Sequence, residues 1–331
     1  MQALLSIMPG GPETLEIGEL PDPVASTGEV LVRIRACSLN YPDALMIEDK
    51  YQFKPERPYA PGCEVAGVIE TVGSGVTGFT VGDRVCAMIG HGGLAEQVAV
   101  PAEKLFHLPA ERSFEEGAAF LMTYLTSIHA LLDRGHIKAG DTLLVLGAAG
   151  GVGLAAVELG KALGARVVAA VSSVEKAALA RAKGADETVV YPIAPLDKDQ
   201  SKALAEAFKK ACGPDGAHVI YDGVGGDYSE PALRAIAWEG RFLVVGFPAG
   251  IARLPLNLPL LKGCDICGVF LGAWREINPQ ANARHVAQLF ALWNDGKIAP
   301  HISQRYTLQT AAQGISLLGA RGALGKLVVS I

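Results

Sequence analysis

The segment Gly147-Ala148-Ala149-Gly150-Gly151-Val152-Gly153 has the spacing that most directly suggests chemistry in this 331-residue chain. An apolar strand pattern precedes it and a helical pattern follows it. Glycines let a phosphate approach backbone N–H groups because no Cβ intervenes, and a helix start favours an anion. Gly150 and Gly153 match the last two glycines of G-x-G-x-x-G, whereas Ala148 replaces the first. The turn therefore predicts a dinucleotide site rather than mere packing, with contacts from Ala149, Gly150, Gly151, Val152 and Gly153.

The end of the next predicted strand distinguishes NAD from NADP. An acidic residue there would hold a ribose 2′-hydroxyl, but the strand ends in Ser172 and Ser173, and Lys176 follows. Small hydroxyls and a cation suit a 2′-phosphate, so we expect NADPH. Glu175 argues against this unless it points outward, and either serine could also cap the following helix.

The elements that position these residues alternate between strand and helix. Strands are predicted at 142–146, 166–171, 188–191, 219–222 and 241–245, with helices at 151–163, 174–183, 202–211 and 228–237. Such βαβ succession predicts a doubly wound parallel sheet with helices on both faces. The chain before residue 114 is instead β-rich, with strands at 29–36, at 67–73 and from 82, and 115–132 is helical. The tail adds helices at 280–293 and 311–318 and a strand at 326–331.

Composition restricts the partners. The formal net charge is −5 and no dense Lys/Arg run occurs, which disfavours a nucleic acid or an anionic membrane as partner. No secretory pattern or membrane-length apolar run is visible, so we expect a cytoplasmic protein with reduced cysteines. Cys264 and Cys267 form the only close pair, and a predicted strand over 263–271 would point them to opposite faces, against a metal or redox role.

Together, these features resemble the medium-chain dehydrogenase/reductase superfamily, and specifically its zinc-free NADPH:quinone oxidoreductase branch, which includes the zeta-crystallins. The resemblance extends over essentially the whole chain. Besides the glycine turn, the matching segments are Gly10–Glu13, Ser38–Asp43, Pro61–Gly67, Val81–Val85, Gly93–Glu96, Leu125–Thr126, Asp222–Gly225 and Gly325–Lys326.

The resemblance implies a Rossmann domain inserted into a GroES-like β-rich catalytic domain, with the substrate in the cleft. We expect the GroES-like domain at 1–122 and 276–331 and the Rossmann domain at 123–275. It also implies a homodimer joined through edge strands near Ile266–Leu271, where an uncovered edge would allow pairing.

The resemblance also permits a test for zinc. Asn40 and Cys63 occupy the positions of two zinc ligands in the alcohol dehydrogenase branch, and no third thiolate occurs near Ala119. One thiol cannot build a tetrahedral zinc site, so we expect no metal.

The remaining site residues are implied by the same resemblance. Asn40, Tyr51 and Asp43 would serve the reaction, although Asp43 could equally cap a helix. Leu45 stands where some relatives carry a second tyrosine, which weakens the inference of any one relative's substrate for this chain. The cofactor site would further include Thr126, Tyr191, Val224, Phe247, Phe270 and Lys326. Tyr191 could instead be an ordinary strand-end aromatic, and Lys326 could form a surface salt bridge.

We therefore expect hydride transfer from NADPH to a quinone or an α,β-unsaturated carbonyl compound, with a proton from solvent or Tyr51. One alternative is an enoyl-thioester or 2-alkenal (enone) reductase, whose chemistry is nearly the same. From another class, the alternative is an NADPH-binding crystallin-like or RNA-binding protein, which the acidic pI disfavours.

Overall fold

The computed structural model describes residues 1–331, which form two compact units. The first unit comprises residues 1–122 and 300–331, and the second comprises residues 123–299. Residues 276–299, which we expected in the first unit, therefore belong to the second. The reason lies in helix α10 (Pro279–Asn294), whose His285 Nε2 bonds to Asp133 Oδ2 of the second unit at 2.7 Å.

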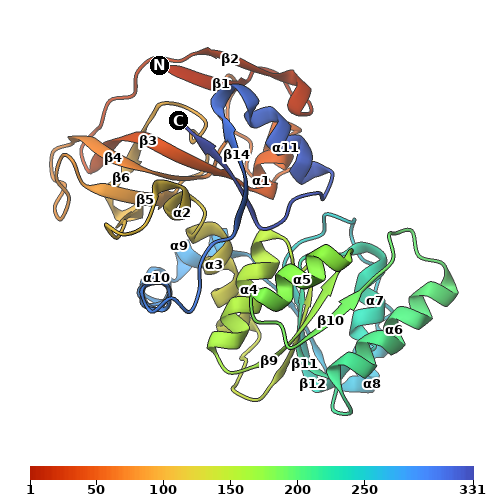
Figure 1. Cartoon of the computed structure of the whole chain (residues 1–331). Coiled ribbons are helices and arrows are strands. Elements are labelled where there is room, and N and C mark those ends of the chain that lie inside the picture. Colours follow the sequence, from red (N-terminus) through yellow and green to blue (C-terminus); the bar gives the residue numbers. More distant parts are fainter. The chain divides into compact units, whose positions relative to one another are not determined.

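The first unit is built on a seven-stranded sheet in the order β14-β15-β3-β4-β5-β7, with β6 also paired to β3 (Figure 1). Alternate residues of β3, including Val30, Val32 and Ile34, enter the core. β15 runs antiparallel to the end of β3, with Leu327 opposite Leu39. The strands are β1 (Gln2–Ser6), β2 (Leu15–Glu19), β3 (Glu29–Leu39), β4 (Glu64–Val72), β5 (Arg84–Met88), β6 (Gln97–Pro101), β7 (Leu105–His107), β14 (Ile302–Thr307) and β15 (Lys326–Ser330), and the helices are α1 (Tyr41–Ile47), α2 (Phe114–Ala118) and α11 (Ala311–Gly319).

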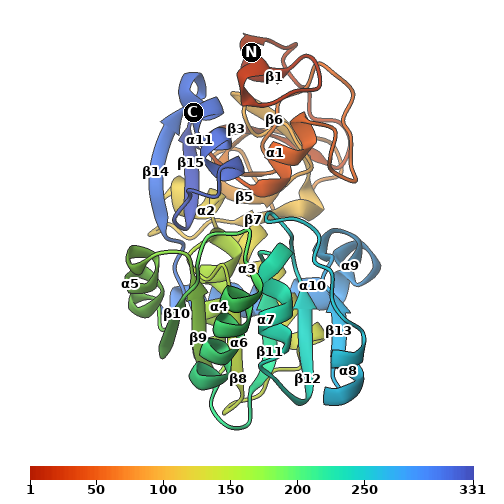
Figure 2. The ribbon, with the colours of Figure 1, turned by 90° about the vertical axis from the view of Figure 1, so that its right-hand side faces the viewer.

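The second unit contains a six-stranded parallel sheet in the order β10-β9-β8-β11-β12-β13. Figure 2 shows these strands side by side, with α6 and α7 in front of them. The order reverses between β8 and β11, and loops at such a switch point form ligand sites. The strands are β8 (Thr142–Leu146), β9 (Arg166–Val171), β10 (Glu187–Val190), β11 (Ala217–Asp222), β12 (Ile236–Val244) and β13 (Asp265–Gly268). The helices are α3 (Leu121–Ile128), which begins in the first unit, α4 (Gly151–Ala162), α5 (Val174–Ala182), α6 (Lys198–Cys212), α7 (Ser229–Leu233), α8 (Asn257–Lys262), α9 (Leu271–Ile277) and α10.

The predicted fold class, a doubly wound sheet inserted into a β-rich domain, is confirmed. The strands at 142–146 and 166–171 lie where the sequence predicts them. None of the helices combines the length and the apolar character that a bilayer crossing requires.

Several predicted elements differ from the structure in extent, and three of the differences have a clear consequence. The helix expected over 115–132 is divided into α2, α3 and a π-helical turn, His129–Arg134. The helix expected over 228–237 ends at Leu233, because Ile236 already pairs with Ala217 in the sheet. The strand expected over 263–271 is only four residues long, so Cys264 precedes it, and both cysteines of the pair are buried.

Candidate functional site

The glycine turn lies between β8 and α4. Gly147 has φ 68°, in the left-handed region, and a Cβ there would approach Val224 Cγ2 to 2.7 Å. A Cβ on Gly153 would strike the backbone carbonyl oxygen of Gly147, so the fold itself requires both glycines. Gly150 differs, because its φ of −82° is ordinary and a Cβ there would lie 3.5 Å from the nearest atom, Gly147 O.

Gly150 is the N-cap residue of α4 and has no side chain that could cap it. The first N–H groups of a helix have no partner within the helix, and an N-cap side chain would normally accept from one of them. A glycine at this position therefore leaves the helix start open to an anion. The turn fits the pyrophosphate of a dinucleotide on this ground.

The other candidate cofactor residues of the second unit gather at the same end of the sheet. We name this end the carboxyl edge, because the carboxyl ends of all six parallel strands lie there; it is distinct from the outermost strand β13. At least one candidate follows each of the six strands. Gly151–Gly153 form the first turn of α4, Lys176 lies in α5 and Thr126 lies in α3. The candidates at the carboxyl edge are Ala149–Gly153 after β8, Ser172 and Ser173 after β9, Tyr191 after β10, Val224 after β11, Phe247 after β12 and Phe270 after β13.

The polar residues after β9 form a small cluster. Ser173 Oγ accepts from the backbone N–H of Lys176 at 3.2 Å, which confirms the capping role for this serine. Lys176 Nζ donates to Ser172 Oγ at 3.1 Å, so a cation and a hydroxyl lie together. Glu175 is exposed, as an outward-pointing residue would be, which weakens the objection it raised. The cluster has the chemistry to hold a phosphate.

The aromatic candidates are of two kinds. Tyr191 is buried, and its ring centroid lies 4.5 Å from that of Tyr228, which supports its packing as a strand-end aromatic. Phe247 and Phe270 are instead 48% and 54% exposed. Of the three aromatic candidates, only these two offer exposed apolar faces to a ligand at the carboxyl edge.

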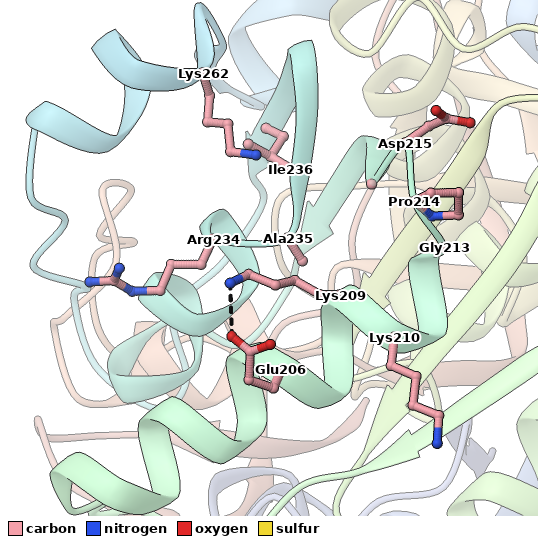
Figure 3. A pocket seen from close by; sticks show the side chains of 11 residues that line it. Glu206, Lys209, Lys210, Gly213, Pro214, Asp215, Arg234, Ala235, Ile236 and Lys262 are labelled. Carbon is pink, nitrogen blue, oxygen red and sulfur yellow. Dashed lines mark hydrogen bonds and ion pairs between the residues drawn. The ribbon is translucent and has the colours of Figure 1, made fainter.

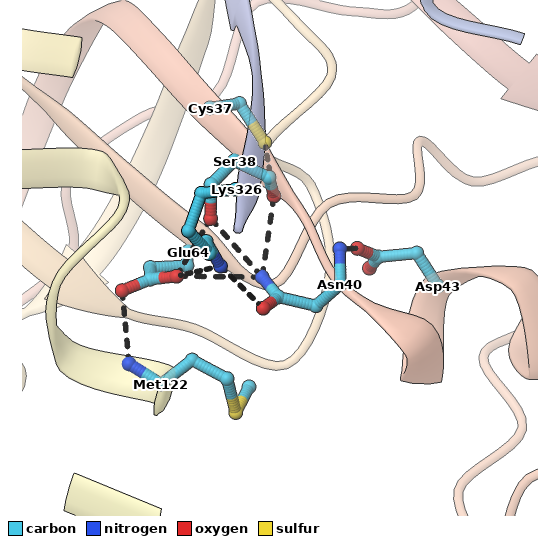
Figure 4. A network of polar contacts seen from close by, with 7 residues as sticks. All are labelled: Cys37, Ser38, Asn40, Asp43, Glu64, Met122 and Lys326. Atoms are coloured by element: carbon cyan, nitrogen blue, oxygen red, sulfur yellow. Dashed lines mark hydrogen bonds and ion pairs between the residues drawn. The ribbon is translucent and has the colours of Figure 1, made fainter. Parts of the chain in front are cut away.

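In the first unit, four buried side chains form what we call the polar network: Ser38, Asn40, Glu64 and Lys326 (Figure 4). Lys326 Nζ donates to Asn40 Oδ1 at 2.6 Å and to Glu64 Oε2 at 3.1 Å. Ser38 Oγ donates to Glu64 Oε2 at 2.6 Å, and Asn40 Nδ2 lies 3.3 Å from the same oxygen. Glu64 Oε1 accepts from the backbone N–H of Met122 at 2.9 Å.

This network corrects the sequence analysis in two respects. The surface salt bridge considered for Lys326 is wrong, because the side chain is buried and pairs with Glu64. Glu64 and Ser38 were missed as site residues. A signal existed, because Glu64 and Lys326 each stand at the start of an apolar strand, and buried charges need partners of opposite sign.

Asp43 supports the same region. Its Oδ2 accepts from the backbone N–H of Asn40 at 2.7 Å, and its Oδ1 accepts from that of Gly62 at 3.1 Å, so the capping interpretation is confirmed. Burial raises the pKa of Asp43 to about 6, against the opposing effect of these two hydrogen bonds. Burial also raises the pKa of Tyr51, and the nearby Cys63 and Asp43 add to this effect.

The donors around Asn40 and Cys63 do not fit a catalytic zinc ion. Zinc needs three protein ligands and a deprotonated thiol. The Asn40 carbonyl oxygen already accepts from Lys326 Nζ at 2.6 Å, and Cys63 supplies a single thiol. Nowhere in the chain do three or more His, Cys, Asp or Glu side chains come together as a metal would require.

A hollow of about 530 Å³ lies at the opposite, amino end of the parallel sheet (Figure 3). Lys209 there pairs with Glu206 at 2.8 Å, and Lys210 points in another direction. The charged groups do not converge, and none of the candidate residues lines the hollow.

The chain can be compared with known proteins on this basis. Residues 26–110 match the family described as alcohol dehydrogenase GroES-like domain, and residues 151–287 match the family described as zinc-binding dehydrogenase. The quinone oxidoreductase of Pseudomonas aeruginosa is 36% identical over 323 residues, which cover 97% of this chain and 96% of that protein. The quinone oxidoreductase-like protein 2 homolog of Nematostella vectensis is 35% identical over 308 residues, which cover 92% of this chain and 82% of that protein.

Among solved structures, Escherichia coli quinone oxidoreductase complexed with NADPH is similar over 100% of both chains, with a TM-score of 0.89 and 29% identity. The expected resemblance is therefore confirmed, and the chain belongs to the quinone oxidoreductase branch of the medium-chain dehydrogenase/reductase superfamily.

Proposed function

We propose that this protein is a zinc-independent, NADPH-dependent oxidoreductase that reduces a quinone or a similar electron-poor carbonyl compound. The observation that carries the proposal is the glycine turn at the switch point, with an open helix start at Gly150. The relatives named quinone oxidoreductase, one of them complexed with NADPH, support the same cofactor and acceptor class.

The carboxyl edge would bind the cofactor. The first N–H groups of α4 would hold the pyrophosphate, and Ser172 with Lys176 would hold the 2′-phosphate. Phe247 and Phe270, which are half-exposed, would cover apolar parts of the molecule. When bound, NADPH would supply a hydride, and the acceptor would take one further proton.

The first unit would orient the acceptor and deliver that proton. The polar network places charged and amide groups around Asn40. Asp43 fixes the backbone of Asn40 and has both oxygens occupied, so its role is to position and not to react. Tyr51 is partly exposed and stays protonated at neutral pH, which suits a proton donor with solvent as the alternative source.

The test is a panel of acceptors mixed with the purified protein and NADPH. We expect NADPH absorbance to fall with a small quinone or a 2-alkenal, and more slowly with NADH in place of NADPH. Turnover with an enoyl-thioester alone would reassign the acceptor class. No loss of absorbance with any acceptor would contradict the proposed activity.

We also propose that two copies pair through β13. This strand lies at the edge of its sheet and exposes Ile266. The exposed apolar side chains of Trp238, Leu260 and Leu261 occur on the neighbouring elements β12 and α8. An uncovered edge flanked by apolar residues is suited to a second copy of the same strand.

A further inference from the structure

The polar network contains one hydrogen-bond donor that its members do not use. An ammonium group has three N–H donors and no acceptor. Lys326 Nζ gives one to Asn40 Oδ1 at 2.6 Å and one to Glu64 Oε2 at 3.1 Å. One N–H of Lys326 therefore remains for a ligand.

Asn40, in contrast, has no donor to spare. Since Lys326 can only donate, the atom that faces it must be the amide oxygen, and since Glu64 can only accept, the amide nitrogen must face the carboxylate. The second amide N–H is directed at Ser38, with 3.3 Å to its carbonyl oxygen and 3.1 Å to Oγ. Asn40 could donate to an acceptor molecule only by breaking one of these bonds.

Solvent exposure identifies the open side of the network. Ser38 and Glu64 are 0% exposed, whereas Asn40 and Lys326 are 6% and 4% exposed. A ligand that reaches the network therefore meets Asn40 and Lys326. Of these two, only Lys326 has an unused donor.

Resting on the proposed function, we propose that Lys326 is the catalytic residue that donates a hydrogen bond to the carbonyl oxygen of the acceptor, and that Glu64 is its positioning residue. Negative charge develops on this oxygen as the acceptor gains two electrons with the hydride. A fixed N–H donor stabilises that charge without reorganisation. Lys326 keeps its proton, and the proton that completes the product comes from Tyr51 or solvent.

Glu64 is suited to position this cation. A buried ammonium is costly unless it is paired, and Glu64 supplies the counter-charge within the core. The carboxylate is itself held by Ser38 Oγ at 2.6 Å and by the backbone N–H of Met122 at 2.9 Å. Lys326 is thus anchored at two points, so the direction of its third N–H is restricted.

The experiment compares two double variants that each remove one Glu–Lys ion pair, one buried and one part-buried. E64Q/K326M removes the proposed donor without leaving Glu64 charged and unpaired. E158Q/K183M is the matched control, because Lys183 Nζ and Glu158 Oε1 form a part-buried pair at 2.9 Å within the second unit. For each protein, NADPH Kd is measured by fluorescence titration, and kcat is measured with a small quinone at saturating NADPH.

We expect E64Q/K326M to lose about 100- to 1000-fold in kcat, the effect of removing one donor to a developing oxyanion. The NADPH Kd of E64Q/K326M should stay within about 3-fold of the wild-type value, and the control variant should keep the wild-type kcat. K326R should recover most of the wild-type kcat, because arginine restores the positive charge and the N–H donors. Unchanged kcat with a strongly raised NADPH Kd would make Lys326 a cofactor ligand and overturn the inference. If both kcat and NADPH Kd are unchanged, the Glu64–Lys326 pair has only a structural role and the inference is wrong. An inactive wild type would instead contradict the proposed function itself.

Discussion

The substitution Gly150→Asp should weaken NADPH binding without lowering the stability of the fold. The backbone there has an ordinary φ of −82°, and a Cβ would lie 3.5 Å from its nearest neighbour, so the side chain can be accommodated. Aspartate is also a better N-cap than glycine by a few tenths of a kcal/mol. We therefore expect the thermal midpoint to stay the same or to rise by about 1–2 °C, given about 2–4 °C per kcal/mol for large domains.

The same substitution should abolish tight cofactor binding. The new carboxylate would accept from the helix N–H groups that the pyrophosphate needs, and it would repel the anion. Loss of one charge-assisted hydrogen bond, worth about 1.5–3 kcal/mol, corresponds to about a 10- to 150-fold rise in NADPH Kd, and loss of two to a larger rise.

The assay is a fluorescence titration with NADPH together with a thermal unfolding curve for each protein. Gly319→Asp adds the same charge in the first unit, where a Cβ would meet nothing within 4 Å, and should leave Kd unchanged. If Gly150→Asp folds and binds NADPH within about 3-fold of wild type, the start of α4 is not the phosphate site and the reasoning fails.

Three further predictions follow from the structure. Lys176→Ala should raise NADPH Kd by about 10- to 100-fold and leave NADH Kd unchanged, since only NADPH carries the 2′-phosphate; an equal loss for both cofactors would contradict this. The pKa of Asp43 is raised to about 6 in the folded protein from 3.8, so its contribution should make the protein less stable as pH rises from about 4 to 6. Urea midpoints across this range should show a flatter pH profile in Asp43→Asn, and an unchanged profile would argue against the raised pKa. Ile266→Arg should convert a dimer to a monomer in light scattering, because it places a charge on the exposed edge of β13; a variant that stays dimeric would exclude this edge.

The parallel sheet could be predicted from the sequence because local signals agree. Residues 167–171 form a continuous run of apolar residues, as a strand buried on both faces does, and glycines stop the helices on either side. The errors occur where a local pattern allows two structures. Ile236 and Ala237 suit either the end of a helix or the start of a strand, and only their pairing with β11 decides.

The polar network could not be predicted in the same way. Lys326 and Asn40 are 286 residues apart, and they meet because β15 pairs with the end of β3. Neither residue indicates this register by itself. The sequence does carry a weaker signal, because Glu64 and Lys326 each begin an apolar strand, and charged side chains are almost never fully buried unless they are paired. That signal indicates a buried ion pair but not the geometry around Asn40.

In the proposed function, cofactor preference and acceptor chemistry are set by separate parts of the chain. The phosphate-binding candidates are fixed by contacts within the second unit, such as Lys176 with Ser172, and the polar network is fixed by contacts within the first, such as Lys326 with Glu64. Substitutions in groups that share no hydrogen-bond partner usually have additive free energies. The combined variant should therefore show the NADPH Kd of Lys176→Ala together with the kcat of E64Q/K326M, each changed by the same factor as in the separate variants. A marked departure from either factor would mean that the cofactor and the polar network act on each other during turnover.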